Sequence, residues 1–129
     1  MVSAVDAASA LADLTEISSH VQAAAILDEQ GGTVAATPAG PAAERLAATG
    51  SELLREADER LGTSDRRPTQ LEAALRVGSL FVVREDGRAV VARTSPRPPS
   101  ALVLYDLATC LRAAAEQQKP KRSRTKAGA

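Results

Sequence analysis

Residues 70–92 have the sequence QLEAALRVGSLFVVREDGRAVVA, and this stretch predicts three consecutive β-strands. Residues 70–77 alternate apolar side chains with polar or small ones, as in a half-buried strand at the edge of a sheet. Residues 80–83 and 89–92 are apolar on both faces, which is typical of central strands that are covered on both sides. The two reversals are predicted at Gly78-Ser79 and at Asp86-Gly87, and the second dipeptide favours a tight hairpin.

Three helices and two further strands complete the predicted order α-β-β-α-β-β-β-α. The helices are expected over residues 4–19, 41–61 and 101–117, and the strands over residues 21–28 and 33–37. The first of these strands is also apolar on both faces, so it joins the two central strands in the middle of one sheet. The predicted fold is an α/β (α+β) sandwich. Its five mostly antiparallel strands lie in the order 2-1-5-4-3, with helices on both faces.

The composition argues against an enzyme. Aromatic residues make up 2% of the 129 residues, so a ligand pocket or base-stacking platform built from aromatic rings is hard to assemble. A single Cys and a single His do not suffice for a zinc cluster or an internal disulfide. The sequence also contains no phosphate-binding loop of the G-x-x-x-x-G-K-[ST] type. We therefore expect no catalytic residue, no cofactor and no metal ion.

The residues with reactive side chains have simpler structural interpretations. Cys110 falls on the inward stripe of the last helix, where a thiol acts as a small apolar side chain, and a nucleophilic role would need His20 beside it. Arg66-Arg67 has the chemistry of an arginine finger, but a solvated loop explains the pair as well. The carboxylate pairs Asp28-Glu29 and Glu85-Asp86 fall in hairpin turns, where they are solvated rather than tuned for proton transfer.

The charge is divided between a body and a tail. Residues 1–118 hold all 16 acidic residues and 11 arginines, which is a net charge of −5. Five cations follow, namely Lys119, Lys121, Arg122, Arg124 and Lys126. We expect one domain over residues 1–117 and a disordered basic tail over residues 118–129. Such a tail would bind nucleic acid or an anionic surface only weakly.

The sequence favours a cytoplasmic protein. No apolar run approaches the ~20 residues that cross a bilayer. The first residues, Met1 to Asp6, lack the basic segment that begins a secretory signal.

The helix over residues 41–61 and the strand over residues 70–77 are candidates for contact with a second copy. Gly50 inside the helix costs about 1 kcal/mol relative to alanine, and close approach of another helix would offset that cost. Close packing of Gly50 on the chain's own sheet is an equal alternative. The open ladder of the edge strand needs a cover or a partner, and pairing with its own copy would continue the sheet across a two-fold axis. The predicted dimer interface consists of Leu46, Ala47, Gly50, Leu53, Leu54, Ala57, Leu61, Leu71, Ala73 and Leu75.

Four stretches resemble, in their order and spacing, a Roadblock/LC7 domain of the bacterial, MglB-like type. Residues 25–35, AILDEQGGTVA, resemble the family's apolar strand, Asp-x-x-Gly turn and return strand. Residues 43–48, AERLAA, resemble the start of its long second helix. Residues 78–92 resemble its glycine, apolar strand and Asp-Gly hairpin, and residues 102–107, LVLYDL, resemble the opening of its last helix. The resemblance covers about residues 5–117.

This resemblance implies a profilin-like sandwich that forms a homodimer through its second helix and third strand and has no catalytic residue. It also implies a small Ras-like GTPase as the partner, which the domain would regulate or hold as a scaffold. Some members of the family accelerate GTP hydrolysis by rearranging the GTPase, without an arginine finger. The candidates for the surface facing the GTPase lie on the polar side of helix 41–61: Arg45, Glu52, Arg55, Glu56 and Glu59.

Two alternative functions stay open at this point. The chain is an assembly module that dimerises without any GTPase, or it binds nucleic acid or an anionic surface weakly through the basic tail. The first alternative predicts the same dimer as the GTPase regulator. It differs in predicting no dependence on bound nucleotide.

Overall fold

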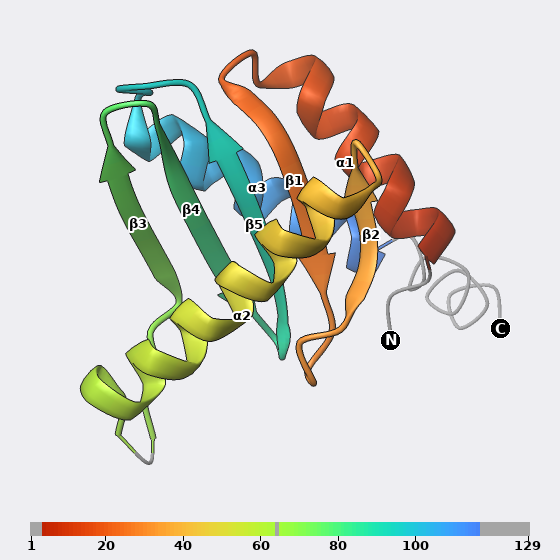
Figure 1. Ribbon diagram of the computed structural model, residues 1–129. Coiled ribbons are helices and arrows are strands. Elements are labelled where there is room, and N and C mark those ends of the chain that lie inside the picture. The colour runs from red at the N-terminus through yellow and green to blue at the C-terminus, as the bar shows by residue number, and fades with distance from the viewer. Residues whose placement is uncertain (1–3, 64, 117–129) are drawn as a thin grey trace, which may run out of the picture.

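The computed structural model describes residues 4–63 and 65–116, so the basic tail expected at residues 118–129 lies outside the described residues. Three helices and five strands follow one another in the predicted order (Figure 1). They are α1 (Ala4–Ile17), β1 (Val21–Leu27), β2 (Thr33–Thr37), α2 (Pro41–Leu61), β3 (Gln70–Leu75), β4 (Gly78–Glu85), β5 (Arg88–Thr94) and α3 (Ser100–Glu116).

The strands form one antiparallel sheet in the order β2-β1-β5-β4-β3, which confirms the predicted topology. The pairing aligns an apolar row that crosses the whole sheet from Leu71 through Val82, Val91 and Ala25 to Ala36. Because side chains alternate along each strand, the residues of this row share one face of the sheet. That face is the one covered by α2.

The helices lie on both faces of the sheet, as predicted. α1 and α3 pack side by side on one face, and α2 crosses the other face diagonally (Figure 1). The core under α1 and α3 is the larger one, with Leu11, Phe81 and Leu107 fully buried. The core under α2 is smaller and includes Leu54, Val82 and Val91. Burial on both faces explains why β1, β4 and β5 are apolar throughout.

The two hairpin turns at one end of the sheet follow the local sequence. In the turn after β1, the carboxylate of Asp28 accepts hydrogen bonds from the backbone N–H groups of Gln30 at 2.9 Å and Gly32 at 2.8 Å. Gly31 has a φ of 85°, which glycine adopts without strain. Asp86 and Gly87 have φ values of 54° and 78°, as a two-residue hairpin turn of this type requires.

Some predicted boundaries were wrong. The reversal expected at Gly78-Ser79 lies at Arg76 and Val77, because Gly78 pairs with Leu75 and already belongs to β4. β4 and β5 are longer than residues 80–83 and 89–92, since their polar ends also join the ladder. A pattern of apolar residues does not predict the backbone pairing of polar ones, even where these are buried, as Ser79 and Thr94 are.

Candidate interaction surface

β3 forms an open edge of the sheet. Within the part of the chain that the structure describes, β3 pairs only with β4, so its outer side presents unpaired backbone N–H and C=O groups. Its side chains are largely exposed: Leu71 alone is partly buried, and Leu75 is 71% exposed. An open edge with apolar side chains and no proline is a template for pairing with another strand.

An apolar groove lies beside this edge, between β3 and the second half of α2. Its volume is about 340 Å³, and charged side chains of α2 and β3 also line it. The apolar lining consists of Leu53, Ala57, Leu61, Leu71, Ala73 and Leu80. Toward the end of β3 a neighbouring recess of about 370 Å³ shares Ala73 and Leu80 with the groove and adds Leu75 and Val77. Together they leave the α2 side of β3 and β4 only partly covered.

Half of the predicted dimer interface is buried inside the single chain. Leu46, Ala47, Gly50, Leu54 and Ala57 face the chain's own sheet. At Gly50 an added Cβ atom would lie 2.9 Å from the Val91 side chain, so close packing on the sheet explains this glycine. The other five residues line the apolar groove or its continuation, where a second copy can reach them: Leu53, Leu61, Leu71, Ala73 and Leu75.

The outward face of α2 carries a mixture of charges. The five residues predicted to face a GTPase are all exposed there: Arg45, Glu52, Arg55, Glu56 and Glu59. Glu56 accepts a hydrogen bond from Arg60 at 2.8 Å, and Glu52 lies 3.8 Å from Arg55. The contact of this face with a GTPase stays a prediction.

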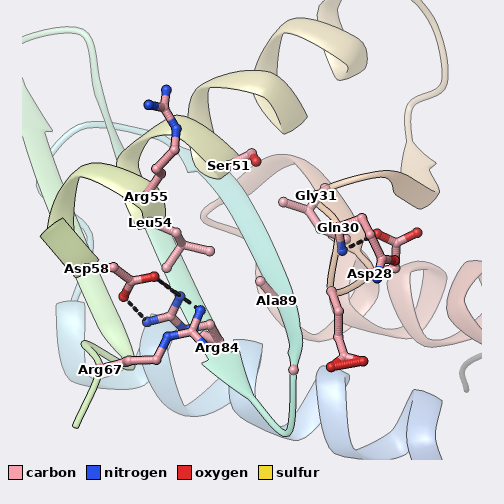
Figure 2. A pocket seen from close by; sticks show the side chains of 13 residues that line it. Asp28, Gln30, Gly31, Ser51, Leu54, Arg55, Asp58, Arg67, Arg84 and Ala89 are labelled. Atoms are coloured by element: carbon pink, nitrogen blue, oxygen red, sulfur yellow. Dashed lines mark hydrogen bonds and ion pairs between the residues drawn. The ribbon is translucent and has the colours of Figure 1, made fainter. Parts of the chain in front are cut away.

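A polar cavity of about 250 Å³ lies on the opposite flank of α2, between the helix and the two hairpin turns (Figure 2). Inside it Arg84 donates to both carboxylate oxygens of Asp58, at 2.9 Å and 2.6 Å. Arg84 also donates to the carbonyl of Pro68 at 2.6 Å, and Arg67 donates to Asp58 at 3.1 Å. These contacts connect α2 to β4 and to the loop that precedes β3.

The same network fixes the charge of Asp58. Its hydrogen bonds from Arg84, supported by those from Arg67, lower the pKa of the carboxyl group from 3.8 to about 2. Sequence reasoning missed this network because Asp58 and Arg84 are 26 residues apart.

The remaining reactive residues are placed as follows. Cys110 is buried, as predicted, and burial raises the pKa of its thiol to about 12. The Nδ1 atom of His20 lies 3.5 Å from Ser95 Oγ. The same described residues were compared with two further kinds of site. Among them, no group of three or more His, Cys, Asp or Glu side chains is placed to hold a metal ion. No helix in residues 4–63 or 65–116 has the length and apolar character needed to span a bilayer.

Comparison with solved structures identifies the fold. A Roadblock/LC7 domain from Streptomyces avermitilis superimposes with a TM-score of 0.70 at 21% identity, over 84% of this chain and 93% of that one. The gliding protein MglB from Thermus thermophilus gives a TM-score of 0.69 at 17% identity, over 86% and 87% of the two chains. A structure described as MglB with a tetrameric arrangement gives 0.55 at 18% identity, over 86% and 83%.

The chain therefore has the fold of Roadblock/LC7 domains, which confirms the fold expected from the resemblance. At these identities the likeness establishes the fold alone. No protein-family model and no curated protein sequence matches the chain.

Proposed function

We propose that this chain is a non-enzymatic homodimeric regulator or scaffold of a small Ras-like GTPase. The observation that carries the proposal is the open β3 edge beside an apolar groove. A second copy paired along β3 would satisfy the backbone groups of the edge and cover the groove at the same time. Self-association is in keeping with the tetrameric arrangement in the description of one MglB structure.

The GTPase is proposed as the partner because of the resemblance to the Roadblock/LC7 family and the fold shared with MglB. In such a dimer Arg45, Glu52, Arg55 and Glu59 stay accessible, since the residues packed on the sheet lie on the other side of the helix, whereas Glu56 also lines the groove that the second copy would cover. Exposed charges on a rigid helix suit partner recognition, because complementary charges raise the association rate and select the partner.

Two measurements on the purified full chain test this proposal. Sedimentation is expected to show a dimer at micromolar concentration. Each Ras-like GTPase encoded in the same genome is then loaded with GDP or with a non-hydrolysable GTP analogue, and we expect one of them to bind with a dependence on the nucleotide. Single-turnover hydrolysis with GTP tests whether the chain accelerates the reaction.

A charge reversal locates the binding face. Glu52→Lys together with Glu59→Lys is expected to weaken GTPase binding at least tenfold without changing the dimer, and Glu16→Lys on α1 is the matched control. If the chain forms a dimer but binds no GTPase in either nucleotide state, the proposed regulation of a GTPase is wrong. The alternative of an assembly module that dimerises without a GTPase would then remain. A monomer at these concentrations would contradict both.

A further inference from the structure

Arg84 and Arg93 lie at opposite ends of the sheet face that α2 covers, and their surroundings differ. Arg84 belongs to β4, and both carboxylate oxygens of Asp58 on α2 accept hydrogen bonds from it (Figure 2). Arg93 belongs to β5 and lies opposite Leu80 and Ala23 in the ladder, both of which pack toward the core under α2. The guanidinium group of Arg93 has no ion pair with any described residue. One arginine of this face is therefore neutralised by α2, and the other is not.

Arg93 lines a recess of about 380 Å³ between the first half of α2, the start of β1 and the end of β5, here called the arginine recess. Arg45 of α2 lines the same recess, and both arginines are exposed. Among the described residues that line it, none is acidic, and Arg45 likewise has no ion pair with a described residue. At this end of the sheet α2 thus brings a second cation to the arginine of a strand, where at the other end it brings a carboxylate.

A β-bulge adds a polar side chain to the arginine recess. The register between β1 and β5 shifts, because Val21 is opposite Thr94 while Ala23 is already opposite Arg93. Gln22 is the extra residue of β1 at this point. Both Gln22 and Ala23 line the recess, so the amide of Gln22 lies in the wall that also holds Arg93. Bulges often re-aim a side chain next to a functional site, and here the side chain is one that both donates and accepts hydrogen bonds.

The chemistry of the arginine recess suits a carboxylate that projects from an apolar surface. Two cations beside one recess repel each other, and an anion between them removes the repulsion. Guanidinium groups form forked hydrogen bonds with carboxylates. A free inorganic anion would leave the apolar part of the recess uncovered, whereas a protein segment with an acidic residue beside an apolar one covers both parts. That apolar part consists of Ala23, Pro38, Ala42, Ala43 and Leu46.

We propose that the arginine recess receives an acidic side chain of the GTPase, held between Arg45 and Arg93, with an apolar neighbour of that side chain packed beside them. This inference rests on the proposed function and names the chemistry of one contact within it. Arg45 is already a candidate for the surface facing the GTPase, and Arg93 extends that surface from α2 onto the sheet. Further along the outward face of α2 the exposed side chains include Glu52 and Glu59, so the GTPase is expected to present cations there.

A charge reversal at Arg93 tests the contact in the full chain. Arg93→Glu is expected to weaken binding of the GTPase found in the nucleotide-dependent binding assay by at least about tenfold, because the two carboxylates then repel. Arg66→Glu, at an exposed arginine of the loop before β3, changes the net charge equally and should leave the affinity unchanged. Arg93 also lines the recess beside Leu75, so sedimentation equilibrium is measured for each variant, and the affinity of the dimer should stay the same.

A charge exchange identifies the residue on the partner. Each exposed Asp and Glu of the GTPase is changed to Lys, and one of these substitutions is expected to weaken binding to the wild-type chain. That GTPase variant should bind the Arg93→Glu chain more tightly than it binds the wild-type chain, because the two reversed charges attract again. Such a recovery also shows that the Arg93→Glu chain is folded.

The outcomes separate this contact from the proposed function. If the GTPase binds the wild-type and Arg93→Glu chains equally, or if no charge exchange restores binding, the inference is overturned and the proposed function stands. An equal loss with Arg66→Glu, or a dimer that Arg93→Glu weakens as much as it weakens GTPase binding, would overturn it as well.

An anionic membrane is the other occupant that the test can reveal. Binding of the wild-type chain to vesicles of phosphatidylcholine and phosphatidylglycerol, lost in Arg93→Glu while GTPase binding is unchanged, would assign the arginine recess to a lipid headgroup and overturn the inference. A wild-type chain that binds no GTPase would overturn both this inference and the proposed function.

Discussion

β2 and β3 are the two edges of one sheet, and the residues that the structure describes cover only the first. In β2, Val34 and Ala35 pack against the core under α1 and α3, while Ala36 packs against the core under α2. α1 also runs alongside this strand (Figure 1). In β3 only Leu71 packs against a core, and the rest of the strand is exposed.

The difference follows from the path of α2. Three residues separate the helix from β2, so its first half lies near that edge, and its diagonal course carries its second half past β3. Because the helix has 21 residues and crosses the sheet diagonally, it leaves part of the face beside β3 uncovered. The side that it leaves uncovered is where we place the second copy.

The largest effect is expected where α2 touches the sheet most closely. Gly50→Leu would push a branched side chain into Val91, because even a Cβ atom at this position lies 2.9 Å from that residue. We expect a loss of about 3 kcal/mol in the free energy of unfolding, measured by urea denaturation. Ala48→Leu, at an exposed position of the same helix, is the control and should change stability by less than about 0.5 kcal/mol. Equal effects of the two substitutions would show that α2 does not pack on β5 in this way.

A pair of lysine substitutions compares the two edges directly. Val34→Lys is expected to destabilise each chain by about 2 kcal/mol, because the side chain packs against the larger core. Leu75→Lys is expected to change the stability of the monomer by less than about 0.5 kcal/mol, because the leucine is mostly exposed in the single chain. Thermal denaturation at dilutions that favour the monomer separates the two effects. Similar losses at both edges would remove the distinction between them.

Because of the network around Asp58, the free energy of unfolding should depend on pH below about 4. Because the pKa of this carboxyl group is lowered to about 2 in the folded chain, its contribution is fully present above the unfolded value of 3.8 and is lost as the pH falls toward 2. We expect Asp58→Asn to cost about 1–2 kcal/mol at pH 7, a figure reduced for the partial exposure of the pair. Urea denaturation from pH 5 to pH 2 should show the difference from wild type shrinking. A constant difference over that range would place the stabilising charge elsewhere.

The smallest effect is expected at the exposed end of α2. Arg60→Ala removes the hydrogen-bonded pair with Glu56 and should lower stability by about 0.3–0.5 kcal/mol in low salt. Arg55→Ala is the control, since its distance of 3.8 Å to Glu52 makes a weaker contact. A loss above about 1 kcal/mol, measured by urea denaturation, would mean that Arg60 has a partner beyond this helix.

Much of the architecture could be predicted because it depends on local patterns. The strands that are apolar on both faces had to be central, and Asp86-Gly87 marks its hairpin through backbone conformations that few other dipeptides adopt. The inward stripe of α3 correctly placed Cys110 in the core. The role of Gly50 could not be decided in this way, since a small residue on a helix permits close approach by any neighbour.

The sequence by itself determined the order of the elements, the strand order and the existence of an exposed edge. The reason is that the alternation of apolar and polar residues in strands, and their periodicity in helices, indicate which side chains must be buried. Only the tertiary structure decided which neighbour buries them. Five of the predicted interface residues face the chain's own sheet, while Leu61, on the same stripe, extends beyond it. Likewise, the ion pair of Asp58 and Arg84 exists only because the crossing angle of α2 brings a helix position and a strand end together. Periodicity records that a side chain is turned inward, whereas the angle between a helix and a sheet determines what it meets there.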